Sequence, residues 1–226
     1  MSTADTRLVV VCLPDGGTPG TLVADAVNRC LPVSGRGCPA DISLAGHFAY
    51  RTRRVSKLVE PWQYRASGGP VRLLDLSAMR ADWHAQAWQR WQLWSHVVAH
   101  LPIARPFWVF ARKHQDNPRR YPITRAQQDY LAQPRIIAMR MHNALATAGQ
   151  LLLPTNELEA FQAGPEQYCG LGWLQAVPGS AFIDPDGGYH TAASGRLADH
   201  VAYLAAANHH IDRLGRTAAL VALAVS

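Results

Sequence analysis

The 226-residue sequence contains only four cysteines, and their spacing does not resemble a metal site. Cys12, Cys30, Cys38 and Cys169 form no CxxC pair, so the sequence does not predict structural zinc. A disulfide between Cys30 and Cys38 is the alternative, although a reducing cytosol disfavours it. We therefore predict no metal and no other cofactor.

Long apolar runs are also missing. No stretch reaches the roughly 20 apolar residues that a membrane-spanning helix needs. The first residues, MSTADTRLVVVCLP, have no basic segment ahead of a long apolar one, so we expect no signal peptide, no membrane association and a cytoplasmic location. Hydrophobic residues make up 48% of the chain and charged residues 17%, which is enough apolar material for a sizeable core.

Lysine is nearly absent, because Lys57 and Lys113 are the only lysines among 22 basic residues. Abundant arginine with so little lysine is typical of a GC-rich genome, so arginine content alone does not indicate phosphate binding. The distribution of charge is more informative. Residues 1–150 carry nineteen basic and nine acidic side chains, whereas residues 151–226 carry three and seven. This asymmetry favours an anionic partner for the first part of the chain.

The most prominent pattern that is present is an amphipathic helix at residues 77–101, SAMRADWHAQAWQRWQLWSHVVAHL. At about 100° per residue, four tryptophans fall on one arc of this helix: Trp83, Trp88, Trp91 and Trp94. We predict that Ser77 caps the helix, that Pro102 stops it and that the indoles anchor the core. A stacking wall for a base or another flat ligand is the alternative.

Apolar runs at both ends of the chain predict buried strands at residues 7–13 and 217–225, the second at the centre of a sheet. The other expected elements are strands at 41–50, 71–76 and 151–153, a hairpin at 181–190, and helices at 21–30, 124–132, 134–147, 155–163 and 194–214. Residues 106–110 and 166–177 remain unassigned. The fold class is therefore α+β, with a single mixed α/β domain over residues 1–226 whose central sheet is packed by amphipathic helices.

Two basic runs, at residues 51–65 and 112–125, are the strongest indication of a binding surface. The second run contains two prolines and is expected to be a loop. The predicted nucleic-acid contacts are Arg51, Arg53, Arg54, Lys57, Arg112, Lys113, Arg119 and Arg120. Aromatic neighbours at Trp62, Tyr64 and Tyr121 could stack on bases.

The loop Asp15–Gly20 follows a predicted strand and precedes a predicted helix, the order found in many phosphate sites. It matches neither GxGxxG nor GxxxxGK[ST], it lacks the lysine, and Asp15 would repel phosphate. A plain turn is therefore the alternative interpretation.

Histidines and acids give few catalytic candidates. His47, beside the first basic run, could act as a general base on a phosphate ester, and Asp15 is the other candidate, but no complete catalytic set is apparent. His96 and His100 lie one helical turn apart, yet the glutamate of HExxH is missing. Turn chemistry accounts for Asp184 without a metal.

Three functional classes follow from these patterns. The first is a nucleic-acid-binding or accessory protein that uses the arginine-rich runs. The second is an enzyme that acts on a nucleotide or another phosphorylated small molecule through the Asp15–Gly20 loop. The third is a subunit of a protein assembly whose basic part meets an acidic protein partner. Oligomeric state, reaction and substrate stay open.

Overall fold

The computed structural model describes residues 6–32, 41–51 and 53–226. Half of the chain, 50%, is helical and 17% is strand, with a mixed sheet packed by helices, which confirms the predicted α+β class. The chain divides into two compact units: unit 1 is Met1–Trp83 with Trp173–Ser226, and unit 2 is His84–Gly172. No helix in the described ranges is long and apolar enough to cross a membrane.

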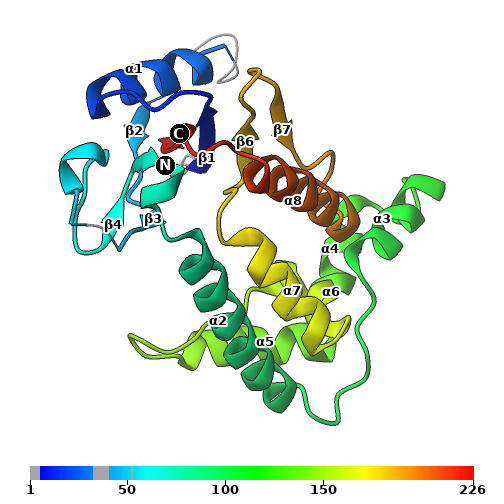
Figure 1. The fold of residues 1–226 in the computed structure, drawn as a ribbon. Coiled ribbons are helices and arrows are strands. Elements are labelled where there is room, and N and C mark those ends of the chain that lie inside the picture. Colours follow the sequence, from blue (N-terminus) through cyan, green and yellow to red (C-terminus); the bar gives the residue numbers. More distant parts are fainter. Residues whose placement is uncertain (1–5, 33–40, 52) are drawn as a thin grey trace. The chain divides into compact units, whose positions relative to one another are not determined.

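Unit 1 is built on a mixed sheet with strand order β2-β8-β1-β6-β7, in which β5 also pairs with β8 (Figure 1). The strands are β1 (Arg7–Leu13), β2 (Ile42–Leu44), β5 (Gly68–Pro70), β6 (Ala181–Ile183), β7 (Tyr189–Thr191) and β8 (Ala219–Val225). β1 is parallel to β6 and antiparallel to β8. Both predicted terminal strands are therefore confirmed, and β8 is buried within the sheet, as its apolar sequence indicated.

Each face of this sheet has its own helix. α1 (Pro19–Cys30) packs Leu22, Ala26 and Cys30 against the face formed by alternate residues of β1, β6 and β8. The opposite face carries Phe182, whose ring lies 6.1 Å from that of His210 on α8 (Leu197–Asp212). Alternation along the strands thus supplies apolar side chains to both faces, which is why β1 and β8 read as continuous hydrophobic runs.

Short elements replace two predicted strands of unit 1. The expected strand at 41–50 is wrong as one piece, because it is interrupted between β2 and β3 (Phe48–Ala49), and β3 pairs with β4 (Arg65–Ala66) in a separate small sheet. The strand expected at 71–76 is also wrong. The N–H of Val71 donates to the carbonyl oxygen of Ala218. The N–H of Leu74 then donates to the carbonyl oxygen of Val71, and this bond closes the 3₁₀ helix η2 (Val71–Leu73). A similar turn, η1 (Val55–Lys57), lies in the first basic run.

Unit 2 is helical. It contains α3 (Phe107–Asp116), α4 (Ile123–Leu131), α5 (Pro134–Leu145), the 3₁₀ helix η3 (Thr155–Glu157) and α6 (Leu158–Gln162). The predicted helix split at Pro134 is confirmed. The strand expected at 151–153 is wrong, because the side-chain amide of Asn143 takes both backbone groups of Leu153 that a neighbouring strand would pair.

The second basic run is only partly a loop. Arg112 and Lys113 lie on α3, which starts directly after Pro106, so the loop prediction for them is wrong. The prolines do not interrupt helices, because Pro118 follows α3 and Pro122 immediately precedes α4. A proline at such a boundary sacrifices no helical hydrogen bond.

Two helices, α2 (Leu76–Val97) and α7 (Pro165–Gln175), contain residues of both units. α2 is the predicted tryptophan helix, but Asp75 rather than Ser77 caps it, since Asp75 Oδ1 accepts the N–H of Ala78 at 3.0 Å. Of its four tryptophans only Trp94 is buried, and Trp88 remains 44% exposed. The predicted tryptophan face is therefore only partly a core face.

Candidate functional site

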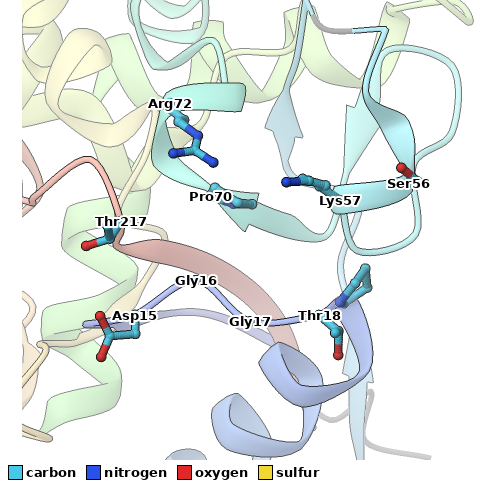
Figure 2. A pocket seen from close by; sticks show the side chains of 10 residues that line it. Asp15, Gly16, Gly17, Thr18, Ser56, Lys57, Pro70, Arg72 and Thr217 are labelled. Carbon is cyan, nitrogen blue, oxygen red and sulfur yellow. The ribbon is translucent and has the colours of Figure 1, made fainter.

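A pocket of about 510 Å³ lies at one edge of the sheet of unit 1 (Figure 2). β1 ends at Leu13, opposite the first residue of β8, and the chain then loops into α1. The pocket is lined by Asp15, Gly16, Gly17, Thr18, Pro19, Ser56, Lys57, Pro70, Arg72 and Thr217. The loop that the sequence singled out for phosphate therefore forms one wall of a concave site.

The loop enters α1 through a self-contained cap. Thr18 Oγ1 accepts the N–H of Thr21 at 3.3 Å, and Thr21 Oγ1 donates to the carbonyl of Thr18 at 2.8 Å. Pro19, at the first helical position, has no N–H to offer. The cap thus takes up the N–H of Thr21 and Pro19 offers none, so attraction for an anion has to come mainly from side chains across the pocket.

Two of the three glycines of the loop, Gly16 and Gly17, lie in close packing. A Cβ on Gly16 would lie 2.9 Å from the carbonyl oxygen of Thr217, and a Cβ on Gly17 would lie 2.2 Å from Thr21 Oγ1. The glycine pair is therefore explained by how the loop fits between β8 and α1. Because Gly16 and Gly17 have no side chains, this wall of the pocket leaves the cations on the opposite wall accessible.

Those cations are Lys57, on η1, and Arg72, on η2, and they form the opposite wall. Figure 2 shows their charged ends pointing toward each other across the Pro70 ring. Within the described residues neither cation has an ion-pair partner. The lysine that the loop lacks in sequence is thus supplied by the first basic run, and Arg72 comes from a segment that the sequence analysis treated as an ordinary strand.

Asp15 lies on the other side of the glycine pair from the two cations. It is exposed, and in Figure 2 its carboxylate is directed away from Lys57 and Arg72. A carboxylate in this position repels phosphate at the rim of the pocket without neutralising the cations through a direct contact.

The eight predicted nucleic-acid contacts are all exposed, but they belong to different units. Arg51, Arg53, Arg54 and Lys57 belong to unit 1, and Arg51 forms an ion pair with Asp75. Arg112, Lys113, Arg119 and Arg120 belong to unit 2. One surface shared by all eight stays a prediction.

The first basic run also carries an exposed aromatic turn, Trp62–Arg65. Trp62 and Arg65 exchange backbone hydrogen bonds of 2.7 and 2.8 Å, and the residues between them, Gln63 and Tyr64, have φ of 43° and 64°. This left-handed backbone is costly for residues other than glycine. The turn leaves Trp62 74% and Tyr64 80% exposed, in the same small sheet that leads into Arg51.

The histidine candidates occupy other places than the sequence suggested. His47 lies between β2 and β3 rather than on a strand, its Nε2 is 3.0 Å from the carbonyl oxygen of Val177, and it does not line the pocket. His100 lies beyond the end of α2 with φ of 65°, so it does not share a helical face with His96.

Cys38 lies outside the described residues, and the prediction of a Cys30–Cys38 disulfide stays open.

Asp184 begins the β6–β7 turn, and the predicted hairpin is present. Its Oδ1 accepts the backbone N–H groups of Asp186 and Gly188 at 2.9 and 2.8 Å, as turn chemistry predicts. Its Oδ2 lies 2.7 Å from Nε2 of His190. Burial opposes ionisation, but the hydrogen bonds from His190, Gly188 and Asp186 outweigh it and lower the pKa of the Asp184 carboxyl group.

Comparison of the chain with protein-family models, curated proteins and solved structures gives no match.

Proposed function

We propose that unit 1 binds a phosphate-bearing small molecule, a nucleotide or another phosphorylated metabolite, in the pocket beside the Gly16–Gly17 loop. The observation that carries this proposal is the convergence of Lys57 and Arg72 opposite the loop, with no carboxylate paired to either cation among the described residues. Two unpaired cations in a concave site favour a polyanionic ligand, because phosphate oxygens would satisfy their donors and their charge.

The size and remaining lining of the pocket support the same ligand class. A volume of about 510 Å³ lies in the range of small-molecule sites. The hydroxyl groups of Ser56 and Thr217 also line the pocket and could orient a ligand by hydrogen bonds. The pocket also lies beyond the carboxyl end of β1, the end of a strand where sheets that contain parallel strands commonly hold ligands.

Calorimetric titration of the full chain with ATP, ADP, AMP and adenosine tests the proposal. We expect affinity to rise with the number of phosphates and adenosine not to bind, because the charges contact phosphate. The variant Lys57→Ala/Arg72→Ala should lose binding, whereas Arg53→Ala/Arg54→Ala, with the same change in net charge outside the pocket, should retain it. Equal loss in both variants, or no binding to the wild type, would contradict a specific site.

The second candidate function is binding of single-stranded nucleic acid, and the aromatic turn is the observation that favours it. Trp62 and Tyr64 are exposed at the tip of a strained turn, and Tyr50, which directly precedes Arg51, lies 6.5 Å ring to ring from Tyr64. Exposed aromatic rings beside arginines match the usual combination of base stacking with phosphate attraction. Backbone strain at non-glycine residues is often retained at functional sites.

Removal of the two exposed rings tests this second function directly. Stacking contributes about 1–3 kcal/mol per base, so Trp62→Ala/Tyr64→Ala should weaken binding of an oligo-dT strand by at least about fivefold. Trp88→Ala, which removes a 44% exposed indole from α2, is the matched control and should have no effect. Unchanged affinity in the Trp62→Ala/Tyr64→Ala variant would eliminate stacking at this turn.

A further inference from the structure

Three metal-ligating side chains meet on the face of the unit 1 sheet that carries Phe182. In the β6–β7 hairpin Phe182 pairs with His190, so both side chains lie on the same face, and Asp184, two residues after Phe182, has the same orientation. α8 supplies His210, whose ring lies 5.2 Å from that of His190 and 6.1 Å from that of Phe182. Hairpin register and the position of α8 therefore bring together residues that are far apart in the chain.

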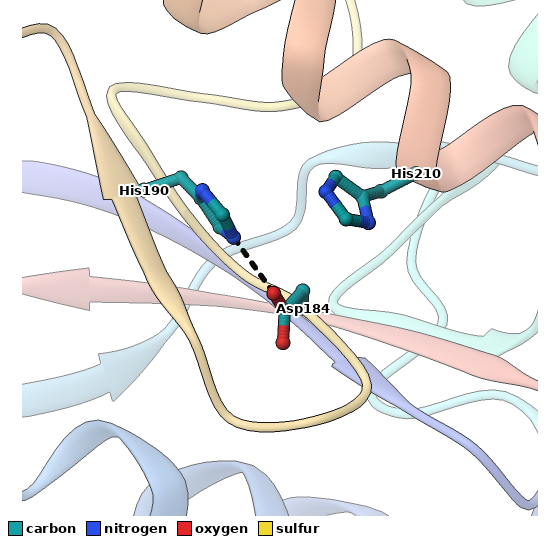
Figure 3. Close-up of side chains that lie close together, drawn as sticks. All are labelled: Asp184, His190 and His210. Carbon is teal, nitrogen blue, oxygen red and sulfur yellow. Dashed lines mark hydrogen bonds and ion pairs between the residues drawn. The ribbon is translucent and has the colours of Figure 1, made fainter.

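One ligand atom from each of Asp184, His190 and His210 lies within 4.8 Å of the other two. Figure 3 shows His190 and His210 on either side of the Asp184 carboxylate, with the dashed contact joining His190 to Asp184. We propose that Asp184, His190 and His210 form a binding site for a divalent transition-metal ion, with Zn²⁺ as the reference ion. None of the three lines the phosphate pocket, so this site is independent of the proposed function.

The carboxylate is already oriented for this role. Its Oδ1 is held by the backbone N–H groups of Asp186 and Gly188, which leaves Oδ2 to face the histidines. Gly188 is needed for this arrangement, because a Cβ there would lie 2.6 Å from Oδ2. Such hydrogen bonds to a ligating carboxylate are the outer-shell support that metal sites commonly show.

The set matches the preferences of zinc-like ions. Two imidazoles and one carboxylate are the protein ligands of many catalytic zinc sites and of non-haem iron sites. Zn–N and Zn–O bonds of about 2.0–2.1 Å place tetrahedral ligand atoms about 3.3 Å apart, so the three groups need only small side-chain rotations to close on an ion. A metal would replace the hydrogen that now lies between His190 Nε2 and Asp184 Oδ2.

Three protein ligands leave one position of a tetrahedral ion for water or substrate. The His190 side chain is 33% exposed, so the site is reached from solvent, whereas Asp184 is only 11% exposed. Arg29 on α1 donates to the carbonyl oxygen of Pro185 at 2.7 Å, which ties the hairpin turn to the core of unit 1. An open coordination position is the feature that distinguishes a reactive from a purely structural metal site.

Zinc and cobalt titrations of the full chain, after treatment with a chelator and dialysis, test the site. We expect one ion per chain by calorimetry and, for Co²⁺, the visible absorption of a four-coordinate complex. His190→Gln/His210→Gln should lower the affinity by more than the roughly 10- to 100-fold that the loss of an outer-shell partner causes. Asp184→Asn should also weaken binding, and circular dichroism will show whether each variant is folded.

The control variant is His96→Gln/His100→Gln, which removes the same number of imidazoles from unit 2. It should bind Zn²⁺ and Co²⁺ like the wild type. Absence of a one-to-one complex in the wild type, or an unchanged dissociation constant in a folded His190→Gln/His210→Gln variant, would overturn the proposal. Should the double variant fail to fold, the single variant His210→Gln, altered on α8 and not in the hairpin, decides by the same criterion.

Discussion

The imidazole Nε2 of His47 lies 3.0 Å from the carbonyl oxygen of Val177, a residue 130 positions later in the chain. This hydrogen bond joins the bend between β2 and β3 to the segment before β6. The His47 ring also packs edge-on against Phe48, with ring centroids 4.9 Å apart. The residue that sequence analysis offered as a general base therefore has a structural contact, in which Nε2–H donates to the carbonyl oxygen, and it is a partly buried group whose protonation must be accommodated inside unit 1.

We predict that His47 makes unit 1 less stable at mildly acidic pH. Burial and, to a smaller extent, Arg65 lower the pKa of His47 in the folded chain, and together they outweigh the opposite effect of the Val177 hydrogen bond. Below the unfolded pKa of about 6.5, protons bind preferentially to the unfolded chain. The free energy of unfolding should therefore fall as the pH drops below 6.5, by up to about 1.4 kcal/mol per pH unit.

His47→Gln isolates this contribution. A glutamine amide can still donate to Val177 but does not titrate, so the dependence of unfolding free energy on pH should become shallower. Urea denaturation at several pH values between 4.5 and 8 measures the slope. His96→Gln, altered at an exposed histidine, should leave the slope as it is, and an unaltered slope in His47→Gln would contradict the prediction.

The tryptophans of α2 should differ strongly in their contribution to stability. Trp94 is 5% exposed and stacks on Phe161 with centroids 5.2 Å apart, whereas Trp88 is 44% exposed. Trp94→Ala should cost about 3–5 kcal/mol of unfolding free energy, and Trp88→Ala less than about 1 kcal/mol. Trp94→Phe should cost less than Trp94→Ala, because it keeps a ring on Phe161 and removes a buried indole N–H without a partner among the described residues. Chemical denaturation of the three variants measures these differences.

Much of the fold was predictable where local chemistry determines it. The continuous apolar runs at 7–13 and 219–225, the Asp184–Gly188 turn and the helix boundary at Pro134 all follow from periodicity, turn residues and proline geometry. The wrong predictions of secondary structure fall where a side-chain hydrogen bond or the end of an element determines the backbone conformation. Residues 151–153 look like a strand, but Asn143 satisfies the backbone of Leu153.

The candidate sites were less predictable because they depend on tertiary pairing. The Asp15–Gly20 loop was identified from strand, glycine and helix order, but Lys57 and Arg72 reach it from separate short turns. His190 could have been connected to Asp184 through the hairpin register, since Phe182 pairs with His190. His210 could not, because no local pattern in α8 indicates which strand it faces.

Unfolding should be cooperative although the chain divides into two units. The division falls inside α2 and α7 and not in a flexible linker, so melting one unit would break helices that continue into the other. We predict that far-ultraviolet circular dichroism and tryptophan fluorescence report the same transition midpoint in urea. Separate midpoints, or limited proteolysis that yields two stable fragments, would contradict this prediction.

Asp15, at the rim of the pocket beside the Gly16–Gly17 loop, should oppose binding of a phosphorylated ligand. Asp15→Asn removes a negative charge beside the Gly16–Gly17 loop while it keeps the size of the side chain. Affinity for ATP in the absence of divalent ions should rise about twofold or more at low salt, and less at high salt because exposed charges are screened. Asp25→Asn, an exposed acid on α1 that does not line this pocket, is the control. Weaker binding by Asp15→Asn would instead assign this carboxylate a direct contact with the ligand.

The last prediction concerns the cations of the first basic run. If Arg51, Arg53, Arg54 and Lys57 contact phosphates of a polyanion, binding must release counterions and weaken steeply with salt. With about four contacts to duplex DNA, the slope of log affinity against log salt concentration should be on the order of −3 to −4.

Arg53→Ala/Arg54→Ala should make that slope shallower by about 2 without unfolding the protein, because exposed charges contribute little stability. Asp75 already pairs with Arg51, so Arg51→Ala should change the slope less than Arg53→Ala. The matched control is Arg112→Ala/Arg120→Ala, which removes the same charge from unit 2. If all eight basic residues form one surface, the control should reduce the slope equally; if only the first run binds, it should not.

Fluorescence anisotropy of labelled single- and double-stranded oligonucleotides between 25 and 200 mM salt, probed with each variant, measures these slopes. Absence of binding at the lowest salt would eliminate the nucleic-acid function and leave the phosphate pocket as the binding site to test.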